Sequence, residues 1–176
     1  TKNLIADLNN PRAQYLNQQL VEASVTLLRN KQNILPLQRL DSLKVAALAI
    51  GTDTETDFQR GLARYTQVDT FFLTPTSSIE DLLALKEKLQ GYDLVVTGVH
   101  RLNLKAGSSN FGITAEMNLF LKDLIRSKAT IVSVFGNVYS LASLESLDKA
   151  DAVIAAYQET PLTQDVASQM IFGGVG

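Results

Sequence analysis

Five short apolar runs constrain the fold of this chain most, because each is nearly continuous rather than alternating in polarity. They are rich in valine, isoleucine and phenylalanine, and they occupy residues 45–50, 68–73, 94–99, 130–135 and 152–157. Continuous runs of this length are typical of strands that are covered on both faces, as in parallel sheets. The runs therefore predict a parallel sheet with helices on both sides.

The segments between these runs have helical spacing and well-marked starts. Ser78 precedes two acidic residues and a series of leucines, and Thr114 precedes an apolar face with helical spacing. Both are residue types preferred at helix N-caps, and acidic side chains favour the positive helix start. Thr160 and Pro161 have the order of cap and first helical residue, and Gly173 can end that last helix.

Three less regular helices are also expected. Residues 11–29 predict a long first helix, because apolar residues recur at helical spacing and would be buried on one face. These residues are Leu16, Leu20, Ala23 and Leu27. A shorter helix is expected around 141–147. Residues 53–64 form the weakest expected element, a polar helix at best.

Alternating strands and helices with short connections indicate right-handed βαβ crossovers. We therefore predict an α/β fold, a three-layer αβα sandwich with a doubly wound, mainly parallel five-stranded sheet. The expected strand order is the flavodoxin-like 2-1-3-4-5, with the first helix packed on one face. Residues 1–176 contain no internal repeat, low-complexity segment or Pro/Gly linker, so we expect them to form a single domain.

Composition argues against several classes of partner. Sixteen Lys and Arg residues against eighteen Asp and Glu residues leave a net charge of −2, which gives no basic surface for nucleic acid. Cysteine is absent and there is one histidine, so we expect no metal site. We also expect no membrane segment, because no apolar run approaches the roughly 20 residues that cross a bilayer.

In such sheets ligands bind beyond the carboxyl ends of the strands, where the strand order reverses. The loops 51–57 and 100–112 would face each other there. Loop 51–57 offers glycine and threonine to a flavin phosphate, but its three carboxylates would repel one. A solvated turn that leads into a polar helix is the competing interpretation. A flavodoxin-like cofactor-binding domain stays an alternative, although we expect no cofactor.

Loop 100–112 supplies the candidate site residues. His100 is followed by Arg101 and Lys105, and then by a Gly/Ser/Asn stretch that includes Asn110. We predict that His100, Arg101 and Asn110 contact a substrate or a neighbouring domain, and we expect His100 and Arg101 to be exposed. The alternative is a plain surface loop whose histidine ends a strand. No catalytic residue is predicted, because the chain has no G-x-S-x-G nucleophile motif.

Two groups of sequence segments resemble those of a known family. Residues 23–30, ASVTLLRN, followed by 33–37, NILPL, resemble the entry to the C-terminal domain of family 3 glycoside hydrolases. Residues 132–141, 150–157 and 167–174 resemble that family's succession of strand, Gly-Asn turn, strand ending in Ala-Tyr, and helix ending in Phe-Gly. Val138 stands where the family usually has proline. The sequence at 135–137 and 157–165 is most similar to the β-N-acetylhexosaminidase branch of the family.

The resemblance implies a retaining hydrolase, in which a nucleophile and an acid/base flank the bond. The nucleophilic aspartate belongs to an N-terminal (β/α)8 barrel that is not in this chain. Family β-glucosidases take their acid from a glutamate on the loop after the third strand, whereas loop 100–112 contains no Asp or Glu. In the acetylglucosaminidase branch an Asp–His pair on a loop of the barrel acts as the acid/base instead.

The resemblance therefore implies an accessory domain that is inactive alone and packs against the barrel of the same polypeptide. The barrel would hydrolyse terminal β-linked N-acetylhexosamine, and this domain would touch the carbohydrate at most peripherally. An exposed apolar patch is expected where the barrel docks. The family also suggests a bacterial periplasmic or cell-envelope parent. A purely structural or interaction module is the remaining alternative.

Overall fold

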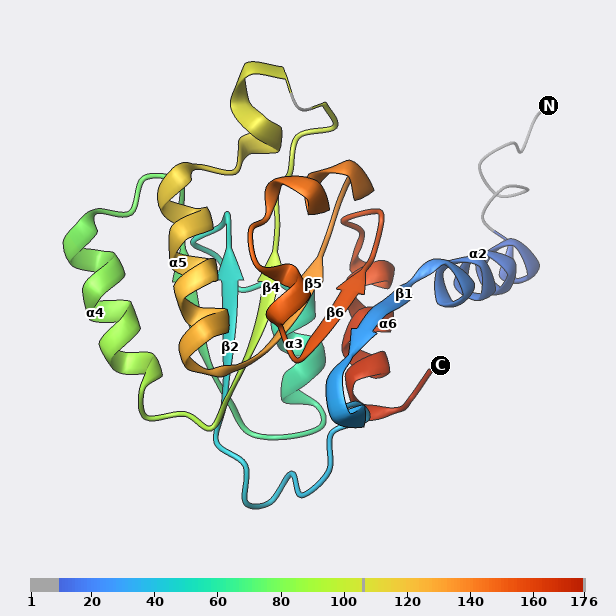
Figure 1. Cartoon of the computed structure of the whole chain (residues 1–176). Helices are drawn as coiled ribbons and strands as arrows, with labels where there is room; N and C mark the ends of the chain where they lie inside the picture. Colours follow the sequence, from blue (N-terminus) through green and yellow to red (C-terminus); the bar gives the residue numbers. More distant parts are fainter. Residues whose placement is uncertain (1–9, 106, 176) are drawn as a thin grey trace.

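A computed structural model describes residues 10–105 and 107–175, and a six-stranded sheet forms its centre (Figure 1). Its strands are β1 (Thr26–Asn30), β2 (Val45–Ile50), β3 (Val68–Leu73), β4 (Leu94–Val99), β5 (Ala129–Val134) and β6 (Ala152–Ala155). The order is β1-β6-β5-β4-β2-β3. Neighbours among β2 to β6 pair in parallel, and β1 pairs with β6 in the antiparallel direction. The five predicted strands and their relative order are confirmed, and β1 is an unpredicted sixth strand at the edge.

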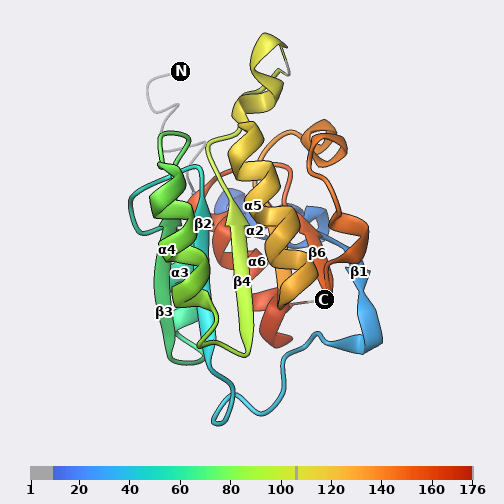
Figure 2. The ribbon, with the colours of Figure 1, turned by 60° about the vertical axis from the view of Figure 1, so that its left-hand side comes forward.

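Helices cover both faces of the sheet, which confirms the three-layer sandwich (Figures 1 and 2). The α-helices are α2 (Pro11–Ser24), α3 (Asp57–Ala63), α4 (Ile79–Leu89), α5 (Ala115–Ser127) and α6 (Pro161–Phe172). Four 3₁₀ helices connect them, namely η1 (Lys31–Asn33), η2 (Gly107–Gly112), η3 (Val138–Ser143) and η4 (Leu147–Lys149). Side chains of α4 and α5 pack on one face, and those of α3 and α6 pack on the other. The predicted loop 100–112 includes residue 106, which lies outside the described residues, as do 1–9 and 176.

The continuous apolar runs arise because successive side chains of a strand enter two different cores. In β4, Leu94 and Val96 pack towards α3 and α6, whereas Val95 and Val99 pack towards α4 and α5. Every residue of β2 and β4 is buried. The middle of the sheet is therefore held by apolar contacts on both faces.

The predicted helix boundaries are confirmed where a capping residue marked them. The side chains of Ser78, Thr114 and Thr160 each accept a hydrogen bond from a backbone N–H in the first turn of α4, α5 and α6, respectively. Gly173 ends α6 in the left-handed conformation, with φ of 79°. Helix α3 is better defined than its polar sequence suggested, because Thr56 forms a capping box at its start.

The predicted first helix over 11–29 is wrong in its length and in its packing. Helix α2 ends at Ser24, and none of its residues is buried: Leu16 is 48% exposed and Leu20 is 69% exposed. Val25 has extended backbone, and Thr26 begins the strand that pairs with β6. β-branched residues favour extended backbone, and the free edge of β6 offers hydrogen-bond partners that a longer helix would leave unused.

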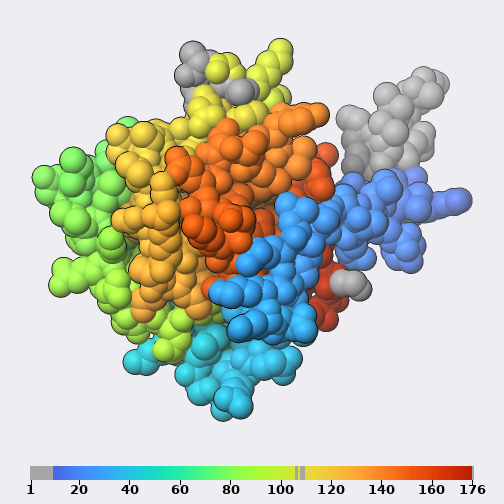
Figure 3. All heavy atoms as spheres, in the orientation of Figure 1, coloured from blue at the N-terminus to red at the C-terminus, as the bar shows by residue number. Residues whose placement is uncertain are grey.

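Helix α2 consequently projects from the body of the molecule (Figure 3). Among the helices of the described residues it contacts mainly α6. The short helix expected around 141–147 is also wrong in detail, because η3 and η4 occupy this region with a break between them. Ser146 in that break has a left-handed backbone, with φ of 67°.

Candidate functional site

The loops that follow β2, β4, β5 and β6 lie at one end of the sheet, which we call the carboxyl edge. They begin in register, because the ladder of backbone hydrogen bonds continues one residue beyond the strands. The N–H of His100 donates to the carbonyl of Ile50 at 2.8 Å, and the N–H of Phe135 donates to that of Val99 at 3.0 Å. The carboxyl edge is therefore a continuation of the sheet rather than a set of independent loops.

Each of the four loops then turns at a residue with positive φ. These residues are Gly51 (99°), Arg101 (53°), Gly136 (140°) and Tyr157 (51°). Glycine adopts such backbone without steric cost, and at Gly51 a Cβ would collide with the carbonyl oxygen of His100. For Arg101 and Tyr157 the left-handed conformation costs about 1–3 kcal/mol each, so surrounding contacts must hold it.

The carboxylate of Glu159 supplies such contacts for Arg101. Its Oε2 accepts a hydrogen bond from the backbone N–H of Arg101 at 2.6 Å, and its Oε1 lies 3.1 Å from Nδ1 of His100. Glu159 belongs to the loop between β6 and α6, whereas His100 and Arg101 follow β4. One carboxylate therefore joins two loops of the carboxyl edge. Its role was missed from the sequence, because no local motif relates residues almost 60 positions apart.

His100 is buried, with 1% of its surface exposed, so the expectation that it lies on the surface is wrong. Its ring stacks on Phe135, with centroids 4.8 Å apart and planes inclined by 16°. Gly98 makes room for it, because a Cβ there would collide with Nε2. Nε2 has no hydrogen-bond partner among the described residues. A neutral ring with its proton on Nδ1 fits these surroundings, because it donates to Glu159 and buries no unpaired N–H.

Arg101 and Asn110 are exposed, and they lie in different parts of the carboxyl edge. The guanidinium of Arg101 reaches the loop after β2, where Nη2 lies 3.3 Å from Oγ1 of Thr54. Oδ1 of Asn110 instead accepts a hydrogen bond from the Ser143 hydroxyl of η3 at 2.6 Å. The structure thus brings His100 and Arg101 together with Glu159, and it anchors Asn110 separately.

The long loop after β4 is closed by backbone and side-chain contacts. The N–H of Asn103 donates to the carbonyl of Phe111 at 2.9 Å, and Nδ2 of Asn137 donates to the carbonyl of Leu104 at 2.7 Å. A cavity of about 560 Å³ opens between this loop and the loops after β5 and β6. Its lining includes Leu102, Phe135, Gly136, Asn137, Tyr157 and Glu159. The carboxyl edge therefore contains a cavity that is open to a ligand or to a side chain of a neighbouring domain.

Loop 51–57 has the geometry of a closed turn rather than of a phosphate cradle. The N–H of Gly51 donates to the carbonyl of Leu73, and the buried hydroxyl of Thr52 lies 3.1 Å from that of Thr54. The hydroxyl of Thr56 caps α3. These donors are already used inside the domain, which favours the solvated-turn interpretation of this loop.

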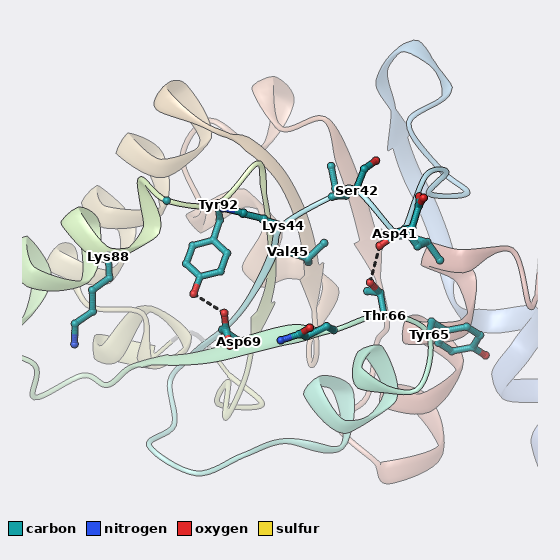
Figure 4. Close-up of a pocket in the computed structure, with 13 residues that line it drawn as sticks. Asp41, Ser42, Lys44, Val45, Tyr65, Thr66, Asp69, Lys88 and Tyr92 are labelled. Atoms are coloured by element: carbon teal, nitrogen blue, oxygen red, sulfur yellow. Dashed lines mark hydrogen bonds between the residues drawn. The ribbon is translucent and has the colours of Figure 1, made fainter.

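A larger cavity, of about 930 Å³, lies at the opposite, amino end of the strands (Figure 4). The hydroxyl of Tyr92 points to Asp69 and donates to its Oδ2 at 2.7 Å, which raises the pKa of Tyr92. The lining carries two lysines, Lys44 and Lys88, and two aspartates, Asp41 and Asp69. These charges balance, so the cavity favours neither anions nor cations, and it is remote from the predicted site residues.

The described residues contain no cluster of three His, Cys, Asp or Glu side chains that could hold a metal ion. Among the described helices, none is both long enough and apolar enough to cross a membrane. The fold and the carboxyl edge together define a doubly wound α/β domain with one antiparallel edge strand. Neither a protein-family model nor a curated protein matches the sequence.

Solved structures of family 3 glycoside hydrolases share this fold. A β-N-acetylglucosaminidase of this family from Paenibacillus sp. str. FPU-7 matches 96% of the chain with a TM-score of 0.73 and 16% identity. A β-glucosidase from Listeria innocua, in complex with glucose, matches 96% with a TM-score of 0.68 and 20% identity. A fungal multi-domain family 3 β-N-acetylglucosaminidase matches 93% with a TM-score of 0.70 and 19% identity.

The chain spans 32%, 26% and 18% of these three structures, respectively. It therefore has the fold of one part of much longer proteins. The likeness agrees with the family resemblance of the sequence phrases, and at these identities it establishes the fold.

Proposed function

We propose that the chain is the accessory C-terminal domain of a family 3 glycoside hydrolase of the β-N-acetylhexosaminidase type. It packs against a (β/α)8 barrel of the same polypeptide, and the barrel hydrolyses terminal β-linked N-acetylhexosamine. The likeness to family 3 structures over almost the whole chain carries this proposal. The sequence segments 23–37 and 132–174 point independently to the same family.

The chemistry of the carboxyl edge favours the acetylglucosaminidase branch. Loop 100–112 contains no Asp or Glu, although the resemblance places the acid of β-glucosidases there. Glu159 lies beside this loop, but each of its oxygens is engaged by a group of the domain itself. The acid is therefore expected from the barrel, and Arg101 is left as a donor at the rim.

Exposed apolar side chains support the docking of another domain. Tyr15, Leu16 and Leu20 are exposed on α2, and Leu27 and Leu28 are exposed on β1. A hollow of about 1060 Å³ lies between α2 and the end of α6. Neighbouring exposed apolar residues of this kind typically mark a partner surface. We place on this surface the docking patch that the sequence resemblance implied.

The proposal is tested by comparing this chain with the longer polypeptide that contains it. The isolated chain should not hydrolyse 4-nitrophenyl N-acetyl-β-glucosaminide, whereas the polypeptide with the preceding residues should. Turnover by the pure chain that disappears when one of its own carboxylates is mutated would contradict the proposal. A sequence before Thr1 that does not encode a (β/α)8 barrel would contradict it as well.

A further inference from the structure

We propose that Glu159 is a positioning residue that clamps the loop after β4 to the loop after β6, and that it is not the acid of the reaction. The kinetic consequence rests on the proposed function. The clamp itself is a property of the described chain and can be tested without it.

Both oxygens of the Glu159 carboxylate are used for the clamp. Oε2 accepts the backbone N–H of Arg101 at 2.6 Å, which is the short distance of a charge-assisted hydrogen bond, and Oε1 faces the buried ring of His100 at 3.1 Å. The side chain of Glu159 is 29% exposed, and that of His100 is fully buried. The carboxylate thus points inward to the sheet rather than outward to a leaving group.

The clamp determines the backbone of Arg101. Its left-handed conformation, with φ of 53°, is unfavourable for a residue with a Cβ, and its N–H is directed at Glu159. The same backbone sends the guanidinium to Thr54, in the loop after β2. Glu159 therefore helps to place one cation of the carboxyl edge, the guanidinium of Arg101.

The buried ring makes the clamp specific for a carboxylate. The N–H of Arg101 and Nδ1 of His100 face different oxygens of the carboxylate. Glutamine at 159 replaces one of these oxygens with an NH₂ donor, so in the same side-chain position it can accept from only one of the two. If its amide donated to Nδ1, the ring proton would move to Nε2, where it would be buried without a partner among the described residues. Glu159→Gln should therefore break one half of the clamp, and Glu159→Ala should break both.

The first experiment uses the 176-residue chain and NMR spectroscopy. Imidazole ¹⁵N shifts of the wild type should report a hydrogen-bonded proton on Nδ1. The hydrogen-bond contribution to this shift should be lost in Glu159→Ala, and in Glu159→Gln only if the amide oxygen stays on the N–H of Arg101. Amide exchange of Arg101 should be about 10- to 100-fold faster in Glu159→Ala, which corresponds to a lost hydrogen bond to a charged group, and Glu159→Gln should lie between. Exchange in β4 and β5 should stay unchanged.

Glu145→Gln is the matched control, because Glu145 is an exposed glutamate that pairs with Lys122 and does not contact His100 or Arg101. It should leave the His100 and Arg101 signals as in the wild type. A wild-type ring protonated on Nε2 would overturn the clamp even if the alanine variant failed to fold. Wild-type exchange of Arg101 in both Glu159 variants would also overturn it.

The second experiment separates positioning from acid catalysis in the longer polypeptide. A series of aryl N-acetyl-β-glucosaminides with better and poorer leaving groups is hydrolysed by the wild type and Glu159→Ala. A positioning residue should lower kcat/KM by the same factor for every leaving group, on the order of 10- to 100-fold. A loss that grows as the leaving group becomes poorer would identify an acid and overturn the proposal.

The two experiments fail in different ways. If the wild-type polypeptide hydrolyses none of these substrates, the proposed function is refuted, and the exchange data alone decide on the clamp. If the polypeptide is active and Glu159→Ala keeps wild-type kcat/KM for all of them, the positioning role is refuted while the proposed function stands.

Discussion

Replacing Gly98 with alanine should destabilise the chain, because Gly98 makes room for the buried ring of His100. A Cβ at this position would collide with Nε2 of His100 and would lie 3.1 Å from Cδ1 of Phe58. Gly98 is in the middle of the sheet, where β2 and β5 flank β4 on both sides. The backbone in the middle of the sheet cannot give way easily, so the ring of His100 has to move.

The expected cost is that of overpacking a dense core, about 1–3 kcal/mol of unfolding free energy. For a chain of this size each kcal/mol corresponds to a fall in Tm of about 2–4 °C. Urea unfolding followed by far-UV circular dichroism gives the free energy from the midpoint, provided that the slope stays constant. Because His100 would be displaced, its hydrogen bond to Glu159 should be weakened in the same variant.

Gly91→Ala is the matched control. A Cβ at residue 91 would meet only the carbonyl oxygen of Lys88, at 3.7 Å, which is ordinary van der Waals contact. This variant should be as stable as the wild type or slightly more stable. Truncating His100 removes the colliding ring, so Gly98→Ala should cost less in a His100→Ala background. Equal stability of the two glycine variants, or full additivity with His100→Ala, would refute the reasoning.

Two further predictions concern other parts of the domain. Asp69→Ala should lower the pKa of Tyr92 towards the ordinary tyrosine value, because the hydrogen bond to Asp69 raises it. A ¹³C NMR titration of the tyrosine rings measures this pKa. An unchanged pKa would contradict the hydrogen bond between Tyr92 and Asp69. The folded-state pKa is the higher one, so the stabilisation by this bond is complete below the unfolded pKa and is lost as the pH rises through the folded pKa. Ser78→Ala should cost about 1 kcal/mol of unfolding free energy, because Ser78 accepts from the N–H of Asp81 at the start of α4. Urea unfolding would show it, and a midpoint equal to that of the wild type would argue that the cap contributes nothing.

The parallel strands could be predicted from the sequence because burial on both faces leaves a local trace. The run 94–99, for example, contains no charged residue, since its alternate side chains enter the two cores. The starts of α4, α5 and α6 were equally readable, because the capping residue and its partner are three positions apart. Such signals need no knowledge of the rest of the chain.

The edge strand and the clamp could not be predicted, because both depend on contacts that are distant in sequence. Thr26 pairs with Ala155, and the pattern of leucines around it is compatible with a longer helix. Glu159 contacts His100 across 59 positions. The burial of His100 depends on Gly98 beside it and Phe135 on the neighbouring loop, so a lone histidine at a strand end gave no indication of it.

The antiparallel direction of β1 brings the exposed apolar helix to the carboxyl edge. Because Thr26 pairs with the last residue of β6, the helix α2 that precedes it emerges beside the loop after β6 (Figure 1). Oη of Tyr157 in that loop lies 3.4 Å from Oγ1 of Thr26. The start of β1 therefore touches the loop after β6, and α2 leaves the body of the molecule from this edge of the sheet. One domain could cover α2 and this edge at once, as the proposed barrel requires. Leu20→Ser should then leave the free energy of unfolding of the isolated chain unchanged, because α2 has no partner there. The same change should lower the free energy of unfolding of the longer polypeptide, and urea unfolding of both would measure the difference.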